Sequence, residues 1–247
     1  MIDGPYITLS SAISLDGYLD TAEPPRLVLS NDLDRDRVDD VRAQNDAVLV
    51  GARTVRLDNP RLLVHSLARQ RVREAAGRSS SPWKITATRT GDLDPGAAFF
   101  ADDGATKLVY CPRSTAPRIR GQLGSGAVVI GLGDEVTMPD LVSDLSDRGV
   151  SSLMVEGGGS IHTQFLAANL VDELHLAVAP FFVGDPRAPR FVDGGAFPWT
   201  SSRRARLAEV RSLGEIVLLR YAMSDRAVTS QPLSSASLRE SLVLGLS

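Results

Sequence analysis

The residues best suited to chemistry lie where an apolar run ends at a carboxylate followed by three glycines. Apolar residues 153–155 predict a short buried strand that ends at Glu156, and the glycines occupy positions 157–159. From 161 to 170, apolar side chains recur at helical spacing, so a helix starts at the glycines. Glycine lets a backbone approach a ligand closely, and a helix start offers free N–H groups and a positive dipole end. This geometry suits a phosphate, although a triple glycine could also be only a tight strand-to-helix connection.

Other polar residues also stand at the ends of predicted strands. They are Asp16, Thr54, Asp58 and Arg89, in addition to Glu156. Ligands of α/β sheets bind at the carboxyl ends of the strands, where loops converge. Thr54 and Asp58 are four residues apart, so one helical turn would place both on one face; the alternative for this pair is a capped, solvated turn.

The elements that must position these residues alternate between strands and helices. Strands are predicted near 6–13, 47–50, 62–64, 84–88, 107–111, 127–130, 153–155, 173–180, 205–210 and 215–221, with a possible resumption of the first strand at 18–19. Helices are predicted from a cap at Ser30 or Asn31 to about Ala43, from Pro139 to about 148, and after the three glycines. This alternation predicts an α/β protein with a largely parallel sheet. The last two strands form a hairpin through Leu213-Gly214, which makes the sheet mixed.

Two polar stretches are expected to lie outside this framework. Residues 66–82 are basic and polar and are predicted to form a solvated surface loop. From Met223 onward the chain is rich in serine, which predicts a mobile tail with a short helix around 238–244. We see no linker and no repeat, so one domain is expected.

Composition excludes several classes of function. The chain has 247 residues and a net charge of −3, which argues against nucleic acid or an anionic membrane as the main partner. Cys111 is the single cysteine and there are three histidines, so neither a disulfide framework nor a cysteine-based zinc site is expected. No apolar run is long enough to span a membrane, and residues 1–4 show no secretory signal. We therefore expect a cytoplasmic protein without a metal. The fingerprints of Rossmann, Walker, α/β-hydrolase and zinc-deaminase sites are missing as well.

Three blocks of sequence together resemble the reductase domain of riboflavin biosynthesis, the RibD C-terminal domain family. The blocks are ITLSSAISLDG at 7–17, RAQNDAVLVG at 42–51 continuing through TV at 54–55 and DNPRL at 58–62, and VEGG at 155–158 continuing through LVDEL at 170–174 to AP at 179–180 and Gly184. The family is related in fold to dihydrofolate reductase. The resemblance implies a three-layer α/β/α fold with a reductase domain over 1–222 and a tail over 223–247.

The resemblance also implies an activity. The family reduces the ribosylamino side chain of a pyrimidine phosphate to ribitylamino, by hydride transfer from NADPH to C1′ of the opened sugar imine. The substrate could be the diaminopyrimidinone or the deaminated uracil. Two alternatives stay open: a reductase of the same fold that acts on a pterin or a secondary metabolite, and a non-catalytic nucleotide-binding module. A homodimer is expected from the family and from the general frequency of two-fold oligomers.

Carried over by position, two sets of residues are implied as contacts. The cofactor set comprises Ala12, Thr54, Asp58, Gly158, Gly159, Ser160, Ile161, His162 and Thr163, with Arg89 as a partner for the 2′-phosphate. Arg89 could equally be an exposed loop arginine. The substrate set comprises Arg42, Leu62 and Glu156, with Glu156 accepting hydrogen bonds from the pyrimidine and required for turnover.

The chain departs from the family pattern on the phosphoribosyl side. His65 stands where the two-domain enzymes usually have an arginine, and Arg26 and Val28 stand where they have a small polar residue and a tryptophan. Either Arg26, with His65, contributes to binding the substrate phosphate, or the substrate differs.

Overall fold

A nine-stranded sheet forms the centre of the computed structural model, which describes residues 4–227. The strand order is β5-β4-β3-β2-β6-β1-β7-β9-β8. The first seven strands in this order are parallel, and β9 and β8 run antiparallel at one edge. The strands are β1 (Tyr6–Ser14), β2 (Ala47–Gly51), β3 (Trp83–Ala87), β4 (Lys107–Pro112), β5 (Val128–Leu132), β6 (Ser152–Gly157), β7 (Glu173–Ala179), β8 (Arg206–Leu213) and β9 (Ile216–Ala222). The predicted mixed sheet with an antiparallel C-terminal hairpin is confirmed.

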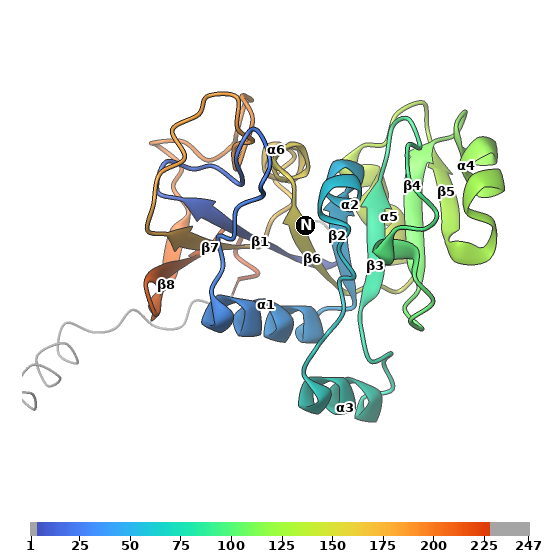
Figure 1. Cartoon of the computed structure of the whole chain (residues 1–247), viewed down its shortest axis with the longest axis horizontal. Helices are drawn as coiled ribbons and strands as arrows, with labels where there is room; N and C mark the ends of the chain where they lie inside the picture. Colours follow the sequence, from blue (N-terminus) through green and yellow to red (C-terminus); the bar gives the residue numbers. More distant parts are fainter. Residues whose placement is uncertain (1–3, 228–247) are drawn as a thin grey trace, which may run out of the picture.

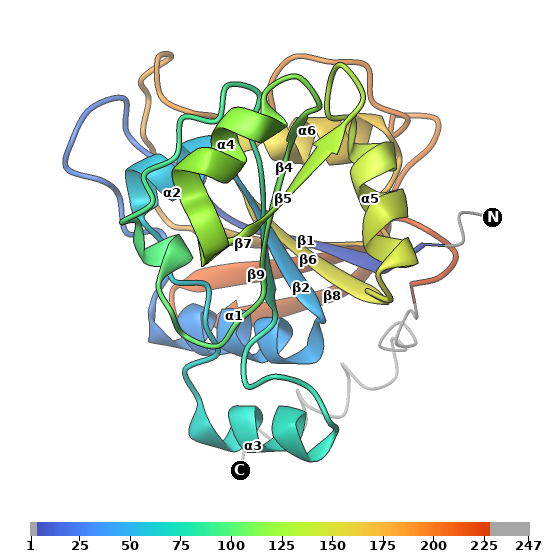
Figure 2. The ribbon, with the colours of Figure 1, turned by 90° about the vertical axis from the view of Figure 1, so that its right-hand side faces the viewer.

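Helices lie on both faces of this sheet and make the fold three-layered (Figures 1 and 2). They are α1 (Asp32–Gln44), α2 (Ala52–Asp58), α3 (Leu67–Ala75), α4 (Ala116–Leu123), α5 (Met138–Asp147) and α6 (Gly159–Ala167), with short 3₁₀ turns at Ala98–Phe100 and Gly124–Gly126. None of the helices in the described part of the chain is both long and apolar enough to cross a bilayer.

Alternation along β2 shows how the sequence builds the two cores. Ala47 and Leu49 pack with α5 and α6 on one face, whereas Val48 and Val50 pack with side chains of α1, α2 and α4 on the other. All of these strand residues are at most 1% exposed. A strand covered on both faces must be apolar throughout, which explains the continuous run AVLV. The two packed layers therefore hold the strand ends, and the loops that follow them, in fixed positions.

Helix caps agree with the sequence pattern. Asn31 caps α1 by accepting a hydrogen bond of 3.0 Å from the backbone N–H of Asp34, and aspartates occupy the first turn. The predicted helix at Pro139 forms as α5, with Leu141, Val142 and Leu145 buried.

Several local predictions were wrong. The stretch 66–82 is not only a loop, because it contains α3, capped by Ser66. Its Arg73 is buried and donates hydrogen bonds to the carbonyls of Ala43 and Asn45, so this basic side chain serves packing rather than solvation. Residues 62–64 form no strand, and Tyr18 makes only an isolated bridge to Arg190. The helix α4 was not predicted.

The packed domain extends beyond the predicted boundary at 222. Met223 is 5% exposed and belongs to the main core, and Ser224 donates a hydrogen bond of 2.5 Å to Asp172. The guanidinium of Arg226 donates to the carbonyls of Gly4 and Pro5. Residues 223–227 are thus part of the domain. The remainder of the predicted tail, including the helix expected at 238–244, lies outside the described residues.

Candidate cofactor and substrate site

A cleft of about 1110 Å³ opens at the carboxyl ends of the parallel strands. The helices α2 and α6 both begin there, directly after β2 and β6 (Figure 1). Most residues singled out from the sequence line this cleft: Ala12, Arg26, Thr54, Asp58, Arg89, Glu156, Gly158, Gly159, Ser160, Ile161 and His162. Segments that are far apart in the chain therefore meet at one edge of the sheet, where ligands of such folds bind.

The glycine turn leaves the start of α6 open. Gly158 is the N-cap residue, and it has no side chain to accept a hydrogen bond from the first turn. Its carbonyl accepts from the N–H groups of Ile161 and His162. Gly157 has a φ of +149°, which residues with a side chain rarely adopt. The first backbone amides of α6 are thus available to an anion, with the helix dipole favouring negative charge.

Neighbouring atoms crowd the positions at which side chains would begin on Gly158 and Gly159. A Cβ atom added to Gly158 would lie 3.3 Å from the hydroxyl oxygen of Thr54, and one added to Gly159 would overlap the carbonyl oxygen of Arg190. A Cβ atom on Gly51 would lie 2.9 Å from Cγ1 of Ile161. Gly159 therefore permits a close approach of backbone to backbone, whereas Gly158 and Gly51 make room for the side chains of Thr54 and Ile161. We call the glycine turn with the first amides of α6 the cradle.

The helix α2 brings Thr54 and Asp58 to the same cleft, as their spacing predicted. Thr54 lies against the glycine turn, whereas Asp58 forms an ion pair with Arg26. Arg26 also pairs with the buried carboxylate of Asp20. Two carboxylates therefore hold Arg26, which reduces the positive charge that it can present to a ligand.

Glu156 and Arg42 form a half-enclosed, two-pronged ion pair at the end of β6. Nε and Nη2 of Arg42 each donate a hydrogen bond of 2.6 Å to one carboxylate oxygen of Glu156. Their side chains are 16% and 12% exposed. Burial is the strongest single influence and disfavours the charge on Arg42, but the charge and hydrogen bonds of Glu156, together with the charge of Asp39, outweigh it and raise the Arg42 pKa. Arg42 itself does not line the cleft, so it acts on the cleft through Glu156.

Three arginines that line the cleft, Arg53, Arg89 and Arg190, have no carboxylate partner among the described residues. Arg89 follows β3 and Arg53 lies in the first turn of α2, and both are exposed. Guanidinium groups in this condition can bind a phosphate without first breaking an ion pair. The expected phosphate contact at Arg89 is therefore geometrically available.

The ring of His162 is buried at the edge of the cleft and holds neighbouring segments together. Its Nδ1 lies 3.1 Å from the carbonyl oxygen of Phe191, so this nitrogen carries the proton. Nε2 is buried and has no hydrogen-bond partner among the described residues. Complete burial lowers the pKa of His162 to about 4. Thr163, the next residue, accepts a hydrogen bond from the N–H of Asp193 and donates one to the carbonyl of Gly159. Both residues thus connect α6 to the loop that carries Arg190.

Besides Arg42, two further predicted substrate contacts, Leu62 and His65, lie away from the cleft lining. Leu62 is 3% exposed, has a φ of +53°, and packs in the second core. The backbone N–H of His65 donates to Asp39, and its side chain is exposed. The direct contacts expected for these side chains are not evident in the arrangement, because neither reaches the cleft surface.

Some contacts at the cleft have no local signal in the sequence. Arg190 donates a hydrogen bond of 2.9 Å to the Tyr18 hydroxyl and lies 4.7 Å from the centre of that ring. Their separation of 172 positions explains why no sequence pattern linked them. Asp16, by contrast, has a structural role. Hydrogen bonds from Ser14, Val183 and Gly184 outweigh desolvation and lower its pKa to about 2.

No group of three or more metal-ligating side chains occurs between residues 4 and 227. The cleft instead combines an open helix start, unpaired arginines and a carboxylate held by a guanidinium. These features suit an extended phosphorylated nucleotide at the glycine turn and a heterocycle at Glu156. Fold and cleft together define a three-layer α/β domain of the dihydrofolate reductase-like class, with a cleft whose charges suit a nucleotide.

Comparisons with known proteins define the family. Residues 5–219 match the family model "RibD C-terminal domain", and the chain belongs to this family. The chain is 30% identical over 212 residues to the 2,5-diamino-6-ribosylamino-4(3H)-pyrimidinone 5′-phosphate reductase of Archaeoglobus fulgidus, covering 85% of this chain and 94% of that protein. The protein of the same name from Methanothermobacter thermautotrophicus is 31% identical over 221 residues, covering 89% and 98%.

Solved structures support the fold. A pyrimidine reductase-like protein from Corynebacterium diphtheriae superposes with a TM-score of 0.76 at 22% identity, covering 88% of this chain and 91% of that one. The riboflavin biosynthesis reductase of Saccharomyces cerevisiae gives a TM-score of 0.65 at 21% identity, covering 89% and 90%.

Proposed function

We propose that this protein is an NADPH-dependent reductase that converts the ribosylamino side chain of a pyrimidine phosphate to ribitylamino. The observation that carries this proposal is the position of the Glu156–Arg42 pair, one residue before the open glycine turn of α6. A carboxylate for a heterocycle and a cradle for a phosphate are thus adjacent. The names and the near-complete coverage of the archaeal relatives support the same substrate class.

Different residues of the chain would bind the cofactor and the substrate. The first amides of α6, with Thr54 beside them, would hold a phosphate of the cofactor, and Arg89 would pair with the 2′-phosphate that distinguishes NADPH from NADH. NADPH supplies the hydride when bound. The protein's contribution is to orient the reacting groups and to exclude water from them.

Glu156 would bind the pyrimidine. The guanidinium of Arg42 fixes the orientation of the carboxylate, and an ionised carboxylate only accepts hydrogen bonds. It therefore suits the N–H and amino groups of an aminopyrimidine. A fixed acceptor beside the cofactor cradle would hold the side chain of the substrate in reach of the nicotinamide.

The test is NADPH oxidation with each candidate pyrimidine. We expect turnover with the diaminopyrimidinone ribosylamino phosphate, the compound in the names of the archaeal relatives, and slower or no turnover with the deaminated uracil. Turnover with the uracil alone would correct the substrate. Binding of NADPH without oxidation in the presence of either compound would favour a reductase of another substrate or a non-catalytic module.

A homodimer is also part of the proposal. On one face of the C-terminal hairpin, Leu207, Val210 and Val217 are 54%, 58% and 41% exposed. The strand register places them beside Leu219 and Tyr221 on the same face. A continuous apolar sheet face of this kind is typical of subunit contacts. Sedimentation analysis should give a dimer for the parent and a monomer for Val210→Glu. A monomeric parent would contradict the proposal.

The cytoplasmic location stays a prediction.

A further inference from the structure

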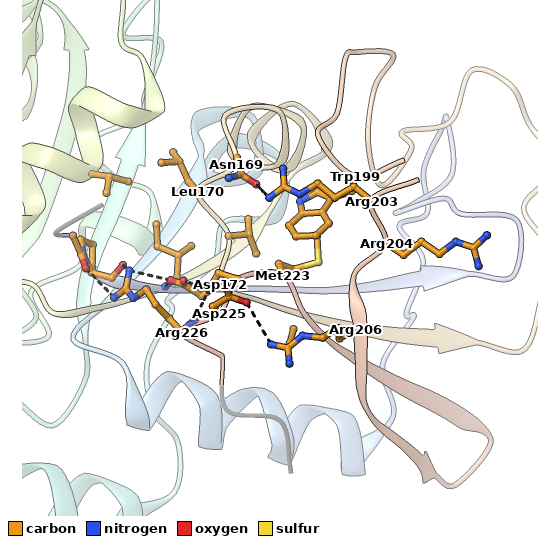
Figure 3. A pocket seen from close by; sticks show the side chains of 17 residues that line it. Asn169, Leu170, Asp172, Trp199, Arg203, Arg204, Arg206, Met223, Asp225 and Arg226 are labelled. Atoms are coloured by element: carbon orange, nitrogen blue, oxygen red, sulfur yellow. Dashed lines mark hydrogen bonds and ion pairs between the residues drawn. The ribbon is translucent and has the colours of Figure 1, made fainter. Parts of the chain in front are cut away.

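A second cleft lies at the opposite end of the sheet from the glycine turn. It has a volume of about 710 Å³ and is bounded by the start of β1, the ends of α6 and β9, and the loop before β8. Figure 3 shows Trp199, Met223 and Leu170 around its interior, with arginines at its rim. No residue that lines it also lines the first cleft. The function proposed above leaves this second cleft without a role.

The charge of this cleft is opposite to that of the whole chain. Its lining includes four arginines, Arg203, Arg204, Arg206 and Arg226, and two carboxylates, Asp172 and Asp225. Four positive and two negative charges leave a formal charge of +2, in a chain whose net charge is −3. A local excess of this sign attracts anions.

The pairing pattern shows where the excess positive charge lies. Asp172 is fully engaged, because it accepts hydrogen bonds from Ser224 and from the backbone N–H of Ile7 and forms an ion pair of 3.4 Å with Arg226. Arg226 thus serves the fold and neutralises the buried carboxylate. The excess positive charge therefore lies on the loop before β8 and on Arg206, the first residue of β8.

Within residues 4–227, Arg203 and Arg204 have no carboxylate partner. Arg203 donates to the amide oxygen of Asn169 at 3.3 Å, and Arg204 donates to the carbonyl of Ser201. Arg206 makes a single contact of 4.0 Å with the fully exposed Asp225. An exposed pair at this distance contributes little stability, so Arg206 can change partner readily.

An apolar surface adjoins these charges. The guanidinium carbon of Arg203 lies 4.3 Å from the centre of the Trp199 ring. Stacking on the indole holds the guanidinium in place and leaves its N–H edge for a ligand. Leu170 and Met223 are 8% and 5% exposed and belong to the main core beneath the cleft. A ligand here would meet a cationic rim and an apolar floor at once.

We propose that this cleft binds a small organic phosphate with a planar ring system, of the mononucleotide class. The phosphate would take the N–H edges of Arg203 and Arg206, because guanidinium groups match phosphate oxygens in pairs. The ring would lie on the floor formed by Trp199, Met223 and Leu170. The site is separate from the cofactor cradle and does not depend on the reductase activity.

Trp199 provides a local reporter for the test. The chain has two tryptophans, so Trp83→Phe leaves Trp199 as the sole source of indole fluorescence. In this background we would titrate adenosine 5′-monophosphate and record the emission. We expect saturable quenching, with adenosine and inorganic phosphate each at least tenfold weaker, since each satisfies only one half of the cleft. A Kd of about 5 mM would already mean very weak binding. If the emission shows no saturable change up to this concentration of adenosine 5′-monophosphate, the proposal is overturned.

Variants of the cleft arginines test whether the fluorescence change comes from binding in this cleft. Arg203→Gln combined with Arg206→Gln should weaken the titration midpoint at least tenfold without changing the Kd for NADPH. Arg203→Lys keeps the charge but not the planar fork, and an intermediate midpoint is expected. Arg211→Gln on β8 is the matched control, because Arg211 is exposed but lies outside the cleft. An unchanged midpoint in the double variant, or a midpoint for inorganic phosphate equal to that for the nucleotide, would refute the assignment.

Discussion

Arg42 and Glu156 are 114 positions apart in the sequence, yet they meet through two parallel hydrogen bonds of 2.6 Å each. Arg42 lies near the end of α1, and Glu156 near the end of β6. The pair connects a helix on one face of the sheet to the strand end that precedes the glycine turn. Both side chains are mostly enclosed, so removing either one would leave the other enclosed without a partner of opposite charge.

The first prediction concerns turnover. Glu156→Gln keeps the size of the side chain but removes the charge and one acceptor, so the pyrimidine loses its fixed partner. We expect kcat/KM to fall about a hundredfold, which corresponds to a loss of about 3 kcal/mol of transition-state binding. The Kd for NADPH should stay within twofold. Glu135→Gln, at another acid in the same cleft, is the control. Normal reduction of the pyrimidine by Glu156→Gln would refute the substrate role.

The second prediction concerns stability. Arg42→Met should leave the Glu156 carboxylate half-buried without its partner, and we expect the free energy of unfolding to fall by about 3 kcal/mol. Adding Glu156→Gln to this variant should recover part of the loss, because the unpaired charge is then gone. Denaturant unfolding of the two single variants and the double variant measures this coupling. Additive losses would show that the pair is not coupled.

The third prediction concerns the cradle. Gly159→Ala places a Cβ atom on the carbonyl of Arg190, so the turn must shift away from its position. We expect NADPH to bind at least tenfold more weakly, as measured by fluorescence titration. Gly121→Ala is a suitable control, because Gly121 lies in the interior of α4 with open space around its Cβ position. That change should raise stability slightly. Equal NADPH affinity in Gly159→Ala would place the cofactor phosphate elsewhere.

The fourth prediction concerns the choice of cofactor. Arg89 is exposed in the cleft and has no carboxylate partner among residues 4–227. If it binds the 2′-phosphate, Arg89→Ala should weaken NADPH about tenfold and leave NADH unchanged. Arg71→Ala, an exposed arginine on α3, should alter neither. A parent enzyme with equal affinity for the two cofactors would contradict the assignment.

The sequence predicted the framework well because its signals are local. The apolar run AVLV, the Asn31 cap and the glycine turn each act within a few residues, and each formed as expected. The helix α3 was missed because its buried residue, Arg73, is basic, so the pattern looked like a solvated face.

Longer-range features of the cleft had no comparable signal. The contact between Arg190 and Tyr18, the hydrogen bonds that Val183 and Gly184 donate to Asp16, and the pairing of Arg26 with Asp58 depend on how distant segments fold together. For Leu62, the family pattern suggested a substrate contact. In the structure Leu62 has a φ of +53°, and its side chain packs in the second core. The residue type alone does not specify which way a side chain points.

The last prediction concerns pH, through His162. Its pKa is about 4 in the folded protein, against about 6.5 in an unfolded chain, because complete burial disfavours the charged ring. Above pH 6.5 the ring is neutral in both states, so it adds no pH dependence. Between pH 6.5 and 4 the unfolded chain takes up a proton that the folded protein does not. As the pH is lowered from 6.5 to 4, the free energy of unfolding therefore decreases by up to about 3 kcal/mol. Below pH 4 His162 causes no further decrease.

His162→Gln should remove this slope while keeping an N–H donor for the carbonyl of Phe191. Urea unfolding at several values between pH 4 and 8 measures the difference between parent and variant. Some acid sensitivity should remain, because burial also lowers the pKa of His175. His65→Gln is the control, since His65 is exposed. Parallel stability curves for the parent and His162→Gln would show that His162 is already protonated, or solvated, in the folded protein. In that case the loop with Arg190 could not be held against α6 by a neutral, buried imidazole.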